Sequence, residues 1–347
     1  MKKSLLSIVA FFSLVSCTNE IPLDYGNEPS RLIVNALLDA QKQENKIVVA
    51  LTGHNQVTYI TDARIKVFVN EELKEEITAA TYNETAQGAS PGDYFSSTHF
   101  VPGDKVKIEV STADSQFKAW GEALVPSSMV IERIDTTSVF ITTPFDTQRF
   151  IKLNVTFTDN ANVDNYYRIA IERIQTVDAV SSNTDNDTTV IVNTVERLIS
   201  REDVVLTDGR PTPMDGKNIF DSPENKYGVF DNSRINGRYT MSVSTEYYPY
   251  GQNLYYGVYE NLKDIKNVKT NILVHLLGIS EGEYYYLRAL NILDSDNSGG
   301  PFNEAIKLPS NITGGIGIVG ISTGTSLKLD LQDYKPVLPA TKSIVNR

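Results

Sequence analysis

Short stretches of strictly alternating apolar and polar residues limit most strongly how this chain can fold. Across residues 63–69 every second side chain is apolar: Ala63, Ile65, Val67 and Val69. The same alternation returns across residues 105–110. A period of two that lasts for five or more residues is typical of a β-strand with one buried face. We therefore expect a chain built mainly from β-strands.

Further strand patterns surround these two and are separated by turn signals. They cover residues 32–38, 46–52 and 117–125. Pro91-Gly92-Asp93 and Pro102-Gly103-Asp104 favour tight turns, because proline presets φ and glycine accepts positive φ. Regularly spaced strands of this kind predict a β-sandwich of immunoglobulin or transthyretin type over residues 31–126. Trp120, the only tryptophan, is interpreted as a core or edge residue of that sandwich, with a ligand contact as the alternative.

A second antiparallel β domain, a sandwich or a partly open barrel, is expected over residues 127–347. Its strand patterns cover residues 151–157, 166–177, 198–206, 237–246 and 269–277. Residues 183–187 are too polar to bury and are expected to form a surface loop. Three prolines between residues 208 and 225 predict irregular structure there.

One segment near the C-terminus favours a helix. Ser280 and Glu283 have the spacing of a capping box, in which a hydroxyl and a carboxylate satisfy free backbone donors at a helix start. Tyr284 and Leu287 follow at helical spacing. We expect a helix over residues 281–293, although three consecutive tyrosines also suit a strand.

The N-terminus reads as a lipoprotein signal. Lys2 and Lys3 precede an apolar run over residues 5–15, and Cys17 follows a small residue. The run has 11 residues, whereas a spanning helix needs about 20. We expect residues 1–16 to be removed as a signal peptide, Cys17 to be lipidated, and residues 17–30 to act as a tether. An ordinary signal peptide is the alternative.

Charge and composition exclude several classes of function. The formal net charge is −11, whereas nucleic-acid binding needs a basic surface. Cys17 is the only cysteine, and His54, His99 and His275 lack the spacing of a zinc site. No metal site and no cofactor is therefore predicted. Oxygen-rich stretches over residues 159–164 and 294–305 leave a non-standard calcium loop as an open alternative.

Two motif matches are rejected on structural grounds. Gly315, Gly317 and Gly320 have dinucleotide-fingerprint spacing, but no helix signal follows them. Bulges or close backbone packing explain these glycines better. Gly320, Ser322 and Gly324 match a nucleophile elbow, yet no histidine follows in the order that this fold requires. No catalytic residue is predicted, and we do not expect an enzyme.

Tyrosines crowd one stretch of the second domain around Pro249 and Gly251. Each offers a rigid apolar ring with a polar tip, which suits ligand platforms and protein interfaces. Filling of the domain core is the competing interpretation. If the segment is a loop, the ligand or partner contacts are expected at Tyr247, Tyr248, Tyr250, Tyr255, Tyr256 and Tyr259.

Several of these features together resemble a known family. They are the lipobox followed by Leu23-Asp24, the strand Leu32-Ile33-Val34-Asn35-Ala36, the segment Tyr284-Tyr285-Tyr286-Leu287, Pro301-Phe302-Asn303-Glu304, and the glycine-rich stretch 311–320. The chain resembles Bacteroidota lipoproteins with a domain of unknown function, which are often encoded beside a TonB-dependent outer-membrane receptor. Ala305 departs from the proline that usually follows the glutamate in that family.

The resemblance implies an envelope location and a receptor-associated binding role, and it carries over no catalytic residue. We expect a lipid-anchored protein of the outer membrane, with the periplasmic or surface face undecided. Its expected partners are the membrane, a TonB-dependent receptor, and a small nutrient, glycan or peptide. A structural or adhesive envelope protein is the alternative, and a hydrolase ranks third.

Overall fold

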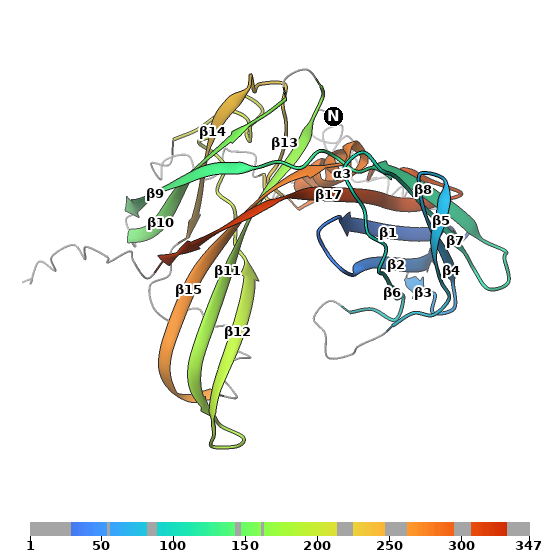
Figure 1. Cartoon of the computed structure of the whole chain (residues 1–347), viewed down its shortest axis with the longest axis horizontal. Helices are drawn as coiled ribbons and strands as arrows, with labels where there is room; N and C mark the ends of the chain where they lie inside the picture. The colour runs from blue at the N-terminus through green and yellow to red at the C-terminus, as the bar shows by residue number, and fades with distance from the viewer. Residues whose placement is uncertain are drawn as a thin grey trace, which may run out of the picture.

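Figure 1 shows the computed structural model of the chain. It describes residues 29–53, 56–81, 89–142, 147–160, 163–213, 225–246, 262–294 and 307–331. The fold is mainly β, with several antiparallel sheets and a helix near the C-terminus. The predicted fold class is therefore confirmed. The division into domains at residue 126 stays a prediction.

Several strands follow the predicted alternation of apolar residues. In chain order they are β1 (Leu32–Asp39), β2 (Asn45–Thr52), β3 (Val57–Tyr59), β4 (Arg64–Val69), β5 (Glu72–Ile77), β6 (Asp93–Ser96), β7 (Lys105–Ser111), β8 (Lys118–Leu124), β9 (Ile131–Thr142), β10 (Thr147–Thr158), β11 (Tyr166–Ser181), β12 (Asp187–Val195), β13 (Val229–Asp231), β14 (Arg238–Glu246), β15 (Leu262–Ile279), β16 (Ile312–Thr313) and β17 (Gly315–Asp330). The helix α3 spans Glu281–Leu293, as the sequence predicted.

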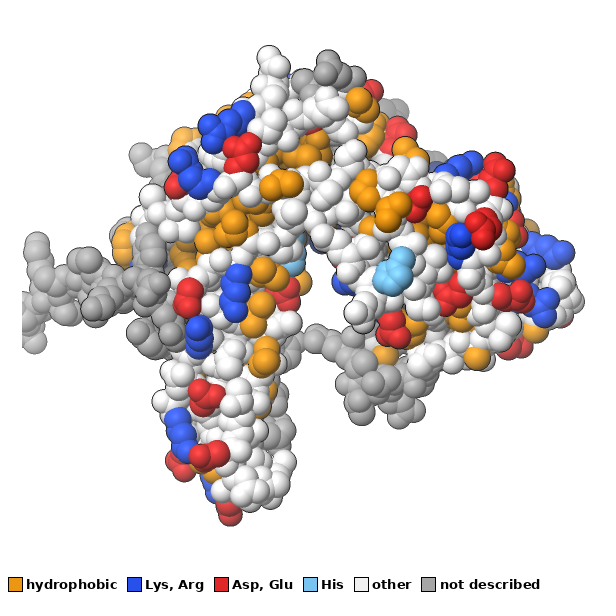
Figure 2. Space-filling view, in the orientation of Figure 1, with side chains coloured by type: hydrophobic (Ala, Val, Ile, Leu, Met, Phe, Trp, Pro, Cys, Tyr) orange, Lys and Arg blue, Asp and Glu red, His pale blue; other side chains and the backbone are white. Residues whose placement is uncertain are grey.

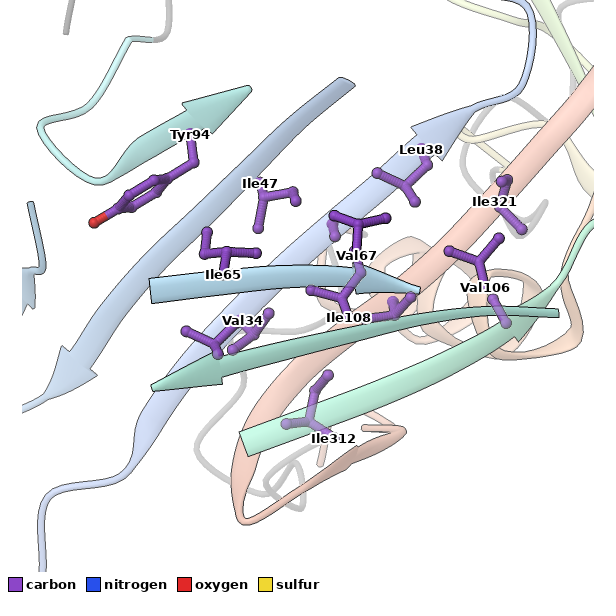
Figure 3. Packing of buried hydrophobic residues seen from close by; sticks show 14 of the residues in the cluster. Val34, Leu38, Ile47, Ile65, Val67, Tyr94, Val106, Ile108, Ile312 and Ile321 are labelled. Atoms are coloured by element: carbon purple, nitrogen blue, oxygen red, sulfur yellow. The ribbon is translucent and has the colours of Figure 1, made fainter. Parts of the chain in front are cut away.

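The N-terminal half is a β-sandwich. One layer is the five-stranded sheet β16-β8-β7-β4-β5, and the other is the β17-β1-β2 part of a nine-stranded sheet. Side chains from both layers alternate inward and fill one core, since burial of apolar surface favours this packing. Figure 3 shows Val34, Leu38, Ile47, Ile65, Val67, Val106, Ile108 and Ile321 in this core.

The second half surrounds a core of its own. The three-stranded sheet β14-β10-β9 and the strands β11, β15 and β17 of the nine-stranded sheet curve around it as a half-barrel. Leu153, Phe157, Val274 and Leu276 are fully buried in this core. β11, β12 and β15 continue beyond it as a long projection (Figure 1).

The strand β17 runs through both halves. Over residues 315–322 it pairs in parallel with β1, and over residues 322–330 it pairs antiparallel with β15. Val319 belongs to the core of the sandwich, whereas Leu327 packs against the second core. β17, which contains most of the glycine-rich stretch 311–320, is therefore the strand that joins the two halves of the nine-stranded sheet.

Glycine is needed in β17 because the backbone is crowded there. A β-carbon added at Gly317, where φ is +118°, would lie 2.1 Å from the carbonyl oxygen of Val34. At Gly324 it would lie 2.1 Å from the carbonyl oxygen of Leu276. These contacts confirm that the glycines permit close backbone packing. β17 continues as a strand through all three glycines, whereas the dinucleotide fingerprint needs a strand that turns into a helix.

We expect Gly317→Ala to destabilise the chain by at least about 3 kcal/mol, because it combines an unfavourable φ with a backbone clash. Gly237→Ala is the matched control. Gly237 also has a positive φ, +73°, but a β-carbon there meets nothing within 4 Å. That control should cost about 1 kcal/mol, the conformational penalty alone. Urea unfolding measures both, and equal losses would contradict the role of crowding at Gly317.

The helix start differs from the predicted capping box. The side chain of Ser280 makes no capping hydrogen bond. Its Oγ instead accepts a hydrogen bond of 3.1 Å from the backbone N–H of Ile321. Glu283 is only 3% exposed and lies against Gly320. The helix start is docked on β17, so tertiary contacts replace the local cap.

Other predictions were wrong in detail. Residues 198–206 form turns apart from one bridge at Ile199, because the Asp203 carboxylate accepts backbone hydrogen bonds from Val205 and Leu206. Trp120 is 39% exposed and points away from the sandwich core. An outward position on β8 explains both its exposure and its place in the alternating pattern.

A groove beside the start of the helix

A groove of about 660 Å³ lies where the end of β8, the start of β11 and the start of α3 meet. Its walls come from residues 122–127, 163–167 and 278–282, together with Gly103, Tyr285 and Asn311. We call it the junction groove. Its position follows from β15, which ends at Ile279 and leads directly into α3.

Exposed apolar side chains converge on the junction groove. Leu124 is 61% exposed, Val163 is 57% exposed and Tyr285 is 48% exposed, and all three line it. They come from the end of β8, from the loop before β11 and from α3. Contiguous exposed apolar surface of this kind marks binding sites more often than isolated apolar residues do.

Three tyrosines form one packed group at the helix side of the groove. The ring centroids of Tyr166 and Tyr284 are 4.7 Å apart, and those of Tyr284 and Tyr285 are 5.2 Å apart. Tyr166 and Tyr285 line the groove, whereas Tyr284 is only 2% exposed. Tyr284 therefore acts as the buried support on which the two groove tyrosines rest.

Polar contacts fix the supporting ring. The Tyr284 hydroxyl donates a 2.8 Å hydrogen bond to Asp231 and accepts one of 2.7 Å from Arg288. Burial is the main cause that raises the pKa of Tyr284 to about 12. Arg288 also forms a 2.8 Å ion pair with Asp208. This network gives the wall a defined geometry without a ligand.

The polar groups at the rim are acidic or neutral. Glu122, Asp164 and Glu281 are the charged residues among those that line the groove. The Tyr166 hydroxyl lies 3.4 Å from Glu281 Oε1, to which it donates. Burial, followed by the hydrogen bond with Tyr285 and the charge of Glu281, raises the pKa of Tyr166. The lining of the groove therefore combines exposed apolar side chains with carboxylates and a neutral phenol.

Asn311 and Gly278 hold the two sides of the groove together. The Asn311 side chain donates to the backbone oxygens of Glu122 and Val319 at 3.0 and 2.7 Å, and accepts from the Val319 N–H at 2.9 Å. A β-carbon at Gly278 would lie 2.7 Å from the carbonyl oxygen of Ser127. The Asn311 hydrogen bonds therefore join β8 to β17, and the close approach at Gly278 leaves no room for a side chain between the segment after β8 and the end of β15.

The site residues predicted from the sequence are not those of the junction groove. Cys17 and the tyrosines Tyr247, Tyr248, Tyr250, Tyr255, Tyr256 and Tyr259 lie outside the described residues. So does most of the loop over residues 294–305. The predicted roles of these residues stay predictions.

The oxygen-rich stretch around residue 160 has a structural role where it is described. Asp159 is 5% exposed, and its carboxylate accepts hydrogen bonds from Asn165, Asn232 and the hydroxyl of Tyr167. Across the described ranges, no group of three or more His, Cys, Asp or Glu side chains is arranged to hold a metal ion. His275 bonds Ser326 at 2.7 Å and approaches Glu172 at 3.3 Å.

Sequence analysis missed the groove because its walls are distant in the chain. Leu124 reads as an outward residue of a half-buried strand, and Val163 reads as a single apolar residue in a polar loop. The tyrosines at 284–286 were the available signal, but their spacing was used only to identify a helix. The convergence of these residues is a property of the tertiary fold.

A comparison with protein families gave a match. A family model described as a domain of unknown function (DUF4249) covers residues 18–328. No curated protein matches the chain. In the part of the chain that the structure describes, no helix is both long and apolar enough to cross a membrane.

Proposed function

We propose that this chain, which belongs to the DUF4249 family, a domain of unknown function, is a non-catalytic ligand-binding component of a TonB-dependent nutrient-uptake system. In this proposal a lipid on Cys17 holds the protein at the outer membrane, and the junction groove contacts the ligand. The observation that carries the proposal is the convergence of Leu124, Val163 and Tyr285 on one groove.

The size and chemistry of the groove suit a small ligand. Its volume of about 660 Å³ falls within the range of about 300 to 1,000 Å³ that is typical of ligand pockets. Such pockets combine apolar and aromatic walls with a few placed polar groups. Here the apolar walls come from three segments, and the placed polar groups are Glu281 and the Tyr166 hydroxyl.

The charges of the residues that line the groove limit the class of ligand that can bind. The charged residues among the groove's lining are all acidic, and Glu122 is already paired with Lys105 at 2.7 Å. An anionic ligand would meet repulsion from Asp164 and Glu281, whereas a positive group would be attracted. We therefore propose a small nutrient with an apolar body and a neutral or positive head, such as a short peptide.

The envelope location rests on the N-terminal sequence. The apolar run that ends at Cys17 and the family resemblance both favour a lipidated, receptor-associated protein. Two or more acyl chains on one cysteine give stable membrane anchoring, whereas one chain gives only marginal binding. The proposal is thus a binding module kept close to a receptor by its anchor.

We expect Leu124→Asp/Val163→Asp to lose binding of a tripeptide of lysine, leucine and tyrosine. The variant removes apolar contacts to the leucine and tyrosine side chains and places two carboxylates that must lose water when the peptide binds, which outweighs their attraction for its lysine. An affinity loss of at least about tenfold is expected, which corresponds to about 1.4 kcal/mol. The measurement is isothermal titration calorimetry on the full chain. The companion peptide, with glutamate in place of lysine, should bind less tightly to the wild type.

The matched control carries the same two changes on the projection. Ile191 and Val195 of β12 are 66% and 74% exposed, so Ile191→Asp/Val195→Asp should fold and keep full tripeptide affinity. Equal affinity in wild type, groove variant and control would exclude the groove as the binding site. Absence of tripeptide binding in the wild type would exclude this ligand class.

The exposed edge of β12 supports a second candidate, a structural or adhesive envelope protein. Among the described strands β12 pairs only with β11, and exposed strand edges with apolar side chains tend to recruit other chains. In this case Ile191→Asp/Val195→Asp would reduce contact of cells with a surface while nutrient uptake stayed intact. Leu124→Asp/Val163→Asp would leave contact of cells with a surface intact in this case.

A further inference from the structure

The outer face of the five-stranded sheet carries a shallow depression of about 380 Å³. It lies on β4, β7 and β8, and it shares no lining residue with the junction groove. The strand register places Lys66, Glu109 and Trp120 in one row across these strands. Arg64, Ser111 and Lys118 form the neighbouring row. We call this surface the basic-aromatic face.

Trp120 is the centre of the face. It is 39% exposed although it is the only tryptophan in the chain. Lys107 Nζ lies 4.9 Å from its ring centroid, and the same ammonium pairs with Glu109 at 2.6 Å. A cation over an indole ring is attracted by the electrons of the ring, even at an exposed site. Lys107 therefore helps to hold the ring in place while part of it remains open.

The cations on this face are unusual for an acidic chain. Arg64, Lys66 and Lys118 line the depression together with one carboxylate, Glu109. Arg64 is paired with Glu76 of β5 at 3.2 Å, so Lys66 and Lys118 are the cations available to a ligand. Within the described ranges neither the Lys66 nor the Lys118 ammonium has an ion-pair partner. The chain as a whole carries a net charge of −11. In Figure 2 blue side chains lie beside red ones on the right of the view, where Figure 1 places β7 and β8.

We propose that the basic-aromatic face binds an anionic saccharide, such as a chain of uronic acid units. The apolar face of a sugar ring stacks on Trp120. Its acidic groups interact with Lys66 and Lys118, and its hydroxyl groups hydrogen-bond with Ser111 and Glu109. The carboxylates of the junction groove then favour positive ligands, whereas the basic-aromatic face favours negative ones.

The spread of the cations favours a saccharide over a nucleotide. Neighbouring strands are about 4.8 Å apart, and β7 lies between β4 and β8, so Lys66 and Lys118 present separate charges across the sheet. A saccharide with one acid per sugar unit also carries separated charges. A compact polyphosphate instead needs several donors that converge on one point, commonly at a helix N-terminus or a backbone nest. The described lining of the depression belongs to strands and the β7–β8 turn.

Because Trp120 is the only tryptophan, the tryptophan fluorescence of the full chain, excited selectively over its tyrosines, reports on this face. We expect oligogalacturonate to give a saturable fluorescence change that weakens as salt rises. A neutral malto-oligosaccharide of the same length should give none. Lys66→Ala/Lys118→Ala should lower the affinity for oligogalacturonate by at least about tenfold, because two charge-assisted contacts are lost.

Lys263→Ala/Lys266→Ala is the matched control, since it removes the same charge from β15 and should keep wild-type affinity. Calorimetry provides a second readout. Absence of both a fluorescence change and a binding heat with oligogalacturonate would overturn the proposal. If the two double variants weaken binding of oligogalacturonate equally, the attraction is nonspecific, and this result would overturn the proposal as well. A response to ATP without one to oligogalacturonate would assign the face to nucleotides instead.

Discussion

Cys17→Ala is expected to move the protein out of the membrane fraction while its β-sheets stay folded. Cys17 precedes the first described strand, β1, which begins at Leu32, so the substitution removes no core contact of the described residues. Each buried methylene of an acyl chain contributes about 0.8 kcal/mol to membrane binding, and stable anchoring needs two chains or more. In the proposed arrangement, loss of Cys17 therefore removes the acyl chains that anchor the protein.

Fractionation of cells followed by immunoblotting measures this effect, and circular dichroism of the purified variant checks the fold. The uncleaved signal is a possible residual anchor, so a second variant should replace residues 1–17 with a signal for soluble export. Both variants should be released or mislocalised. Retention of both in the membrane fraction, with full activity, would show that the membrane attachment does not depend on Cys17.

Glu283→Gln is expected to stabilise the chain at pH 8 and to change it much less at pH 5. Glu283 is 3% exposed, and its Oε2 has no hydrogen-bond partner. Burial is the main cause that raises its pKa to about 7, with Arg168 opposing the shift and Asp39 adding to it. Ionisation of this carboxyl group in the folded chain is therefore costly.

The sign follows from proton linkage. Between the ordinary pKa of 4.5 and the raised value of about 7, the folded state holds a proton that the unfolded state has released. The free energy of unfolding thus falls as pH rises through this window and levels off above it. With about 1.4 kcal/mol per pKa unit, the stability difference between Glu283→Gln and the wild type should grow by roughly 2 to 3 kcal/mol from pH 5 to pH 8.

Urea unfolding at the two pH values measures this difference. Glu281→Gln is the matched control, because Glu281 lies on the same helix but is exposed. The control should show no comparable dependence on pH. A Glu283→Gln variant whose stability gain is the same at pH 5 and pH 8 would contradict the raised pKa of Glu283.

The sequence predicted best those strands whose one face is buried. β4 and β7 alternate between buried and open positions, and both were expected from their apolar residues. β12 was missed because no residue along it is buried, so no burial pattern marks it. The parallel pairing of β17 with β1 was also missed, because pairing between strands that are far apart in the sequence produces no pattern in either local sequence.

Predictions at the candidate site were weaker for a related reason. The crowding at Gly317 could be anticipated from the type of residue alone. The groove could not, since Leu124, Val163 and Tyr285 converge only after β8, β11 and α3 have packed together. Likewise, the spacing of Ser280 and Glu283 marked the helix start correctly, but the sheet beneath it decides which hydrogen bonds their side chains form.

The central claim is that this chain serves a TonB-dependent receptor as an anchored binding component. Affinity purification of the tagged full chain from native membranes after crosslinking tests it most directly, with mass spectrometry as the readout. We predict that a TonB-dependent receptor is enriched with the wild-type chain and with Ile191→Asp/Val195→Asp, and that Cys17→Ala loses it. Repeated purifications of the wild-type chain that return no such receptor would contradict the claim.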